Sequence, residues 1–208
     1  MTEGLMGVKL HSATGFFKKN RSLLIISLII LFGMVMGAWA ISLCEDNAFY
    51  GVADVFKRFL AKRMDQSFFF TFLFCLISYL PMLICSYVFG LCIIGSPAAV
   101  IIPFTKGISM GLVSGYLYSV YSLKGIGFFA LIMLPGLVIS SLVTAVASRE
   151  TLRFSHSLFK MTVLDKKLLL CEEFKTYSLR FIFFFIVIIF SALTDSVMST
   201  AFIKFFDF

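Results

Sequence analysis

Two charged residues, Lys106 and Asp195, lie inside long apolar stretches of the sequence. Charged side chains are costly at membrane depth, and they usually pair with each other or mark an ion or substrate pathway. Lys106 lies nine residues after Pro97, so it would lie about 14 Å into the membrane along a helix. Asp195 lies fourteen residues after Phe181, or about 21 Å deep. We therefore consider an intramembrane pair or one shared wet cavity. The alternative is that Lys106 extends to the membrane surface and Asp195 is protonated or faces the outer leaflet.

Catalytic signals are otherwise weak. The histidines are only His11 and His156, and the sequence has no HExxH, Walker or GxSxG motif. The five cysteines have no metal-binding spacing. We therefore expect no enzyme activity, no catalytic residues, no metal and no cofactor.

The amino-acid composition indicates which kind of secondary-structure element holds these residues. Of the 208 residues, 60% are hydrophobic and only 14% are charged, so the chain lacks the polar surface of a soluble domain. A helix needs about 20 apolar residues to cross the hydrocarbon layer. The sequence therefore predicts an all-α, polytopic membrane helical bundle, which forms a single integral domain over residues 1–208. Its five transmembrane helices are expected at about 22–44, 68–94, 97–121, 125–148 and 181–203.

Basic residues set the orientation of the predicted helices. With the N-terminus inside, eleven bases lie on the cytoplasmic side and six outside, which favours an N-in, C-out topology. The net charge of +7 is therefore interpreted as a topology signal, and no nucleic-acid partner is expected. A six-span alternative would divide the uncharged stretch 66–105, but it leaves a last piece of only about 24 Å.

Small residues recur at helical spacing in two predicted spans. Gly107, Gly111 and Gly115 share one face, and Gly33 and Gly37 form a shorter version in the first span. Such faces let helix backbones approach closely. We expect packing within one chain, with a homodimer as the alternative. Pro103 and Pro135-Gly136 predict kinks.

The outer segment 47–67 has a helical pattern of apolar side chains beside several charges. It predicts an amphipathic helix on the outer membrane surface, either as a simple connection or as a docking surface. The apolar positions are Val52, Val55, Phe56, Phe59 and Leu60.

The chain resembles the stage II sporulation protein M family in short motifs that follow in order along most of its length. These motifs are Lys18-Lys19-Asn20-Arg21, Met64-Asp65-Gln66-Ser67, Gly95-Ser96-Pro97, Lys106-Gly107 with Gly111 and Gly115, and Gly125 with Leu134-Pro135. Many broader relatives carry His-Gly and an acidic residue in span four, whereas here Pro135 is followed by Gly136-Leu137-Val138.

The resemblance implies a multi-pass protein of the bacterial cell membrane, in the mother cell of a sporulating bacterium. It implies a scaffold that localises two peptidoglycan hydrolases, stage II sporulation proteins D and P, during engulfment of the forespore. Membrane lipid is the other expected partner. The alternative function is a permease or transporter-associated subunit, which the buried charges and the prolines suggest.

Overall fold

The computed structural model describes residues 21–43, 68–93, 95–164 and 170–202, and these residues form only helices and turns. The all-α prediction is therefore confirmed. The predicted outer amphipathic helix, with Val52 to Leu60, lies outside the described residues.

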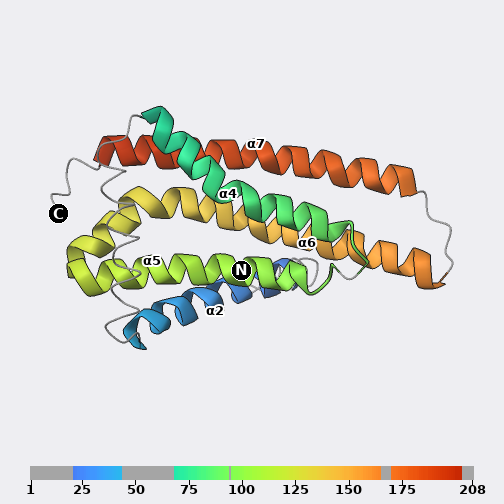
Figure 1. Cartoon of the computed structure of the whole chain (residues 1–208), viewed down its shortest axis with the longest axis horizontal. Helices are drawn as coiled ribbons and strands as arrows, with labels where there is room; N and C mark the ends of the chain where they lie inside the picture. Colours follow the sequence, from blue (N-terminus) through green and yellow to red (C-terminus); the bar gives the residue numbers. More distant parts are fainter. Residues whose placement is uncertain (1–20, 44–67, 94, 165–169, 203–208) are drawn as a thin grey trace, which may run out of the picture.

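The helices run back and forth along one axis (Figure 1). Successive long helices run in opposite directions along this axis, so neighbours in the sequence are antiparallel. In chain order they are α2 (Arg21–Leu43), α4 (Phe68–Gly90), α5 (Ala98–Phe128), the short π-helix η1 (Phe129–Met133), α6 (Leu134–Leu164) and α7 (Leu170–Phe202).

Four helical segments of the described chain are long and apolar enough to cross a membrane, and one of them, Ala98–Met161, has 64 residues. A straight helix of that length would extend about 96 Å, roughly three times the hydrocarbon thickness. Ser122 breaks it, with φ 49° and ψ −127°, and the chain folds back there (Figure 1). The count of four and the expectation of five spans differ because this one segment contains two antiparallel arms.

Each long helix buries one narrow stripe and exposes large apolar side chains elsewhere. On α2 the stripe is Ile26, Ile30, Gly33, Gly37 and Ile41, whereas Leu28, Val35 and Leu43 are exposed. The helices thus have an apolar exterior, and their backbone groups form hydrogen bonds within each helix. A lipid environment requires this arrangement. The polar side chains that the bundle buries then need partners inside it.

Prolines are accommodated in different ways. Pro103 and Pro81 lie inside α5 and α4. Pro135 lies two residues after the end of η1. At this end the amide of Leu134 donates to the carbonyl of Phe129, one residue wider than in an α-helix. A proline has no amide to donate, and a local π-turn is one of the recognised ways in which a helix adjusts.

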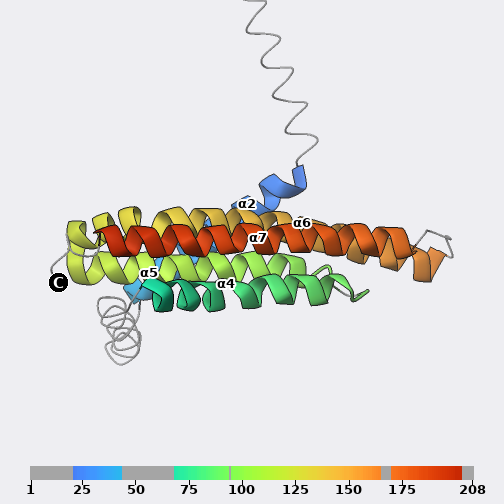
Figure 2. The same ribbon diagram turned by 90° about the horizontal axis from the view of Figure 1, so that it is seen from above.

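The helices α6 and α7 extend beyond the ends of α4 and α5 at the end of the bundle where α7 begins (Figures 1 and 2). They are also longer than the apolar stretches 125–148 and 181–203 that predicted them, because helix continues to Leu164 and begins again at Leu170. The added turns carry charged residues, so we refer to residues 149–164 and 170–180 as the α6–α7 extension.

Candidate functional site: a buried charge cluster

Lys106 lies one-third of the way along α5, and it is only 5% exposed. The turn Gly95-Ser96-Pro97 places it there, because Pro97 directly precedes the helix and its fixed φ suits a helix start. The ammonium nitrogen lies over the ring of Tyr79 on α4, 4.4 Å from the ring centroid. A cation over an aromatic face is attracted by the ring quadrupole, and more strongly where water is excluded.

Asp195 on α7 is 3% exposed. The hydroxyl of Tyr79 donates a hydrogen bond of 2.6 Å to its Oδ2 atom. Gly136 on α6 makes room for the carboxylate, since a Cβ at this glycine would lie 2.6 Å from the carboxylate carbon of Asp195. Ser191, one turn earlier on α7, donates to the Gly136 carbonyl at 2.7 Å.

These contacts bring together three side chains, from α4, α5 and α7, beside a glycine of α6, and we call Tyr79, Lys106, Gly136 and Asp195 the charge cluster. Lys106 and Asp195 lie close enough for their charges to interact. The structure therefore places the two predicted residues around one tyrosine, close to the arrangement of an intramembrane pair. The tyrosine had no signal of its own in the sequence, because it lies in an apolar helix like several other aromatic residues.

The charge cluster can do two kinds of chemistry. Its ammonium, phenol and carboxylate can hold α4, α5 and α7 in one register, because each charge is costly to expose to lipid or to leave unpaired. The same groups can also take up and release protons. A transport pathway would use the second property, whereas a rigid membrane scaffold needs only the first.

The predicted glycine faces pack against each other within one chain. A Cβ at Gly33 would lie 2.6 Å from the Phe104 carbonyl oxygen, and one at Gly111 would lie 2.8 Å from the Ala38 amide nitrogen. Gly37 and Gly107 are equally close to backbone atoms of the opposite helix, and Gly115 lies against Ala38. The faces of α2 and α5 thus occupy each other, so a homodimer would have to use another surface.

A stripe of small polar side chains on α6 was not singled out from the sequence. Its members are buried at positions three or four residues apart: Ser140, Thr144, Ser148, Thr151 and Ser155. Thr151 donates to the Ser86 carbonyl at 2.8 Å, and Ser155 donates to the Cys92 carbonyl at 3.0 Å. These bonds join α6 to α4 and to the turn that follows α4. The spacing of the small polar residues was the signal that could have predicted the stripe.

Tyr177 on α7 forms a second polar contact at the start of the α6–α7 extension. Its hydroxyl donates to the Tyr87 carbonyl at 3.0 Å, and its ring stacks on Phe154 with centroids 4.4 Å apart. Gly90 leaves the space for this hydroxyl, because a Cβ there would overlap it. The tyrosine therefore joins the ends of α4, α6 and α7.

Residues 26–200 match the family model of stage II sporulation protein M. This range contains all five predicted interface glycines, the complete charge cluster and the α6 stripe. The chain belongs to the stage II sporulation protein M family. No curated protein and no solved structure gives a significant match.

Membership of the stage II sporulation protein M family makes the chain a sporulation-related protein. Its apolar helices make it an integral, multi-pass membrane protein. Since the family match covers most of the bundle, the helices that build the charge cluster belong to the family's common region.

Proposed function

We propose that the protein is a non-catalytic membrane scaffold that recruits and localises peptidoglycan-degrading enzymes during engulfment of the forespore. The partners proposed are stage II sporulation proteins D and P, and the location is the mother-cell membrane. The observation that carries the proposal is the family match over residues 26–200. The scaffold role itself is what the resemblance to this family implies.

The bundle has properties that suit such a role. Close glycine packing joins α2 to α5, while the charge cluster links α4 to α7 through Tyr79 and Asp195. A bundle with this many fixed contacts would hold its helices in one arrangement. The outer segment around Val52 to Leu60 is the proposed docking surface for the hydrolases, on the strength of its amphipathic pattern.

Deletion of the gene in a sporulating host tests the proposal. The scaffold role predicts loss of septal wall thinning, failure of engulfment and dispersed fluorescent fusions of the two hydrolases. The protein purified in mild detergent should retain both hydrolases, and replacing Val55, Phe56 and Phe59 with serine should release them. A matched control replaces Leu28, Val35 and Leu43, on the lipid-facing side of α2, with alanine. Normal engulfment in the deletion strain would contradict the proposal.

A permease or transporter-associated subunit is the second candidate, because Lys106 and Asp195 are both buried at depth. The double variant Lys106→Met with Asp195→Leu distinguishes the two functions, since it removes both charges together and leaves neither of them uncompensated. A scaffold would keep engulfment and the position of the hydrolases. A transport pathway built on these charges would be lost, although the protein remains in the membrane at its normal level.

A further inference from the structure

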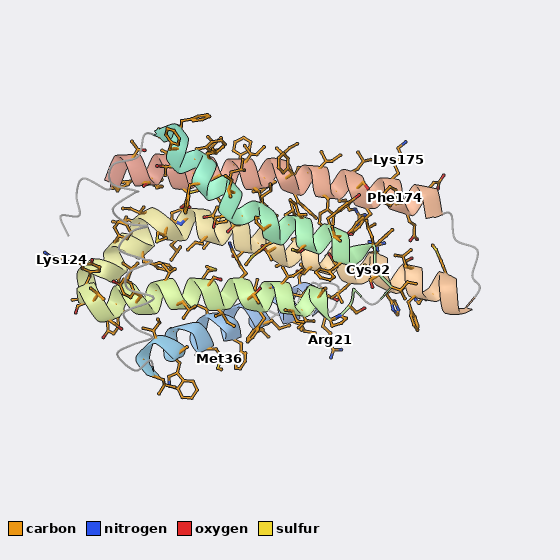
Figure 3. All side chains as sticks on the ribbon, viewed as in Figure 1. Arg21, Met36, Cys92, Lys124, Phe174 and Lys175 are labelled. Atoms are coloured by element: carbon orange, nitrogen blue, oxygen red, sulfur yellow. The ribbon has the colours of Figure 1, made fainter. Side chains whose placement is uncertain are left out.

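The α6–α7 extension encloses a pocket that has no place in the scaffold proposal. Its volume is about 270 Å³, and its lining includes two arginines and three glutamates. Phe154 and Tyr177 form its apolar floor, where their rings stack. Phe174 and Lys175 mark this part of α7 beyond the end of α4 (Figure 3). The pocket therefore combines both signs of charge with an aromatic base.

Some of the charges are already used within the protein. Arg180 forms an ion pair with Glu150, and Ser157 donates a hydrogen bond of 2.6 Å to Glu173. Arg153 on α6 and Glu172 on α7 are exposed and both line the pocket, and neither has an ion-pair partner within the described ranges. One unpaired cation on α6 and one unpaired anion on α7 thus line the same pocket.

The pocket lies where the apolar parts of both helices end. The last uncharged residue of α6 before the pocket is Ser148, and α7 becomes continuously apolar from Phe181. A bilayer has about 30 Å of hydrocarbon and about 40–45 Å with its headgroups, which leaves several ångströms of headgroup layer on each side. Residues 150–157 extend about 10 Å along α6, so the pocket falls at this layer.

An apolar surface continues from the pocket toward the membrane. Leu142 and Val146 lie eight and four residues before Glu150 on the same side of α6, and Phe183 and Val187 follow Arg180 at helical spacing on α7. Leu142 is 58% exposed and Phe183 is 62% exposed. Acyl chains below a bound headgroup would lie against these side chains.

We propose that this pocket binds a phospholipid whose headgroup joins a phosphate to a primary ammonium, as in phosphatidylethanolamine. The phosphate lies against Arg153, the ammonium lies against Glu172, and the chains follow Leu142 and Phe183. An arginine suits phosphate because its guanidinium donates in a planar fork. The glutamates disfavour an anionic headgroup, and a quaternary ammonium such as choline has no N–H to donate to them.

Native mass spectrometry of the full-length protein, with equal amounts of phosphatidylethanolamine, phosphatidylglycerol and phosphatidylcholine in mixed micelles, tests this inference. We expect several-fold more retained phosphatidylethanolamine than either of the other lipids. Arg153→Gln should lower retention several-fold. Glu172→Gln should lower it to a similar extent and should shift the preference toward phosphatidylglycerol. Lys160→Gln and Lys175→Gln are the controls, because they remove charges from the same helices outside the pocket lining.

Equal retention of the three lipids would overturn the inference, as would Arg153 and Glu172 variants that bind like the controls. Soluble glycerophosphoethanolamine carries the same headgroup without acyl chains. If it displaced the lipid at a concentration similar to that of the lipid, the pocket would bind a free zwitterion, and the lipid would be overturned as its ligand. Thermal unfolding midpoints in detergent without lipid, equal to that of the unmodified protein, establish that each variant is folded. The result does not depend on the scaffold role, which can fail separately.

Discussion

Lys106 and Asp195 illustrate how two costly residues are retained in a membrane bundle. Each is buried, and each contacts Tyr79 through a different part of that side chain: the ring face for the ammonium and the hydroxyl for the carboxylate. Removing one partner from a buried pair leaves an uncompensated charge, whereas removing both leaves none. The stability of the bundle should therefore depend on whether the charges are removed singly or together.

A double-mutant cycle measures this dependence. We expect Lys106→Met and Asp195→Leu to destabilise the bundle by about 3–5 kcal/mol each, and we expect the double variant to lose much less than their sum. The free energy of unfolding in bicelles is the quantity to compare. Lys124→Met, at the exposed turn beside Ser122, is the control. Strictly additive losses would show that the two charges act separately.

Ser122 has a backbone conformation that glycine adopts more easily. Its φ of 49° is the only positive φ of a non-glycine residue within the described helices and turns, and such conformations cost about 1–3 kcal/mol. Ser122→Gly should stabilise the protein by about 1 kcal/mol, since the relief exceeds the entropy cost of glycine. Thermal unfolding in detergent measures the change. Ser119→Gly in the regular part of α5 should have the opposite effect, and a loss in both variants would contradict the strain at Ser122.

The sequence predicted some residues of the charge cluster and not others, for a physical reason. Lys106 and Asp195 are recognisable because charges are rare in apolar stretches. In the sequence, Tyr79 does not differ from other aromatic residues of membrane helices. Only the fold places it between the two charges. Gly136 was interpreted as a site of kinking, whereas in the structure it also makes space for a carboxylate on another helix. Contacts across helices depend on packing that no local pattern records.

At the scale of elements, α2 and α5 are joined almost backbone to backbone. Gly111 lies where a Cβ would overlap the Met34 carbonyl oxygen and approach the Ala38 amide nitrogen to 2.8 Å. Backbone atoms cannot move aside as a flexible side chain can, so even one methyl group must separate the helices. The interaction of these two helices should therefore be unusually sensitive to small increases in volume.

Gly111→Ala is expected to destabilise the bundle by about 1–3 kcal/mol, the usual cost of overpacking. Gly111→Val should cost more, because its two γ-methyl groups add volume to a contact that already has no room for a Cβ. Ser109→Ala, at an exposed position two residues earlier on α5, provides the control. Unfolding free energies in the same bicelles compare the three variants. If Gly111→Ala were as stable as Ser109→Ala, the close packing of α2 and α5 would be wrong.

Glycine spacing predicted that two helix faces pack closely, but it did not reveal that they pack on each other. The two faces have glycines at matching intervals of four residues, and α2 and α5 lie side by side only in the folded chain (Figure 1). The α6 stripe could have been predicted in the same way, from small polar residues at intervals of three and four positions. The lengths of α6 and α7 were underestimated, because charged helical turns outside the membrane carry no apolar signal.

For the whole molecule, the turn at Ser122 decides how many times the chain crosses the membrane. With the turn, α5 and α6 are separate passes, so the start of α2 and the end of α7 lie on opposite sides of the membrane. Without it, Ala98–Met161 would be one segment and the chain would cross four times. The basic residues favour an inner N-terminus, so the two arrangements predict opposite positions for the C-terminus and different positions for Lys124.

Cysteine accessibility separates the two arrangements. In a chain without its native cysteines, Lys124→Cys should react with a membrane-impermeant maleimide added outside intact cells, because the turn beside Ser122 would face outward. Ser96→Cys, in the exposed turn before α5, should react only after the membrane is opened, since it lies at the opposite end of that helix. Alkaline phosphatase fused after residue 208 should be active, as an outer C-terminus requires. Protection of Lys124→Cys in intact cells together with an inactive fusion would contradict five crossings, and it would require the long segment to be arranged differently in the membrane.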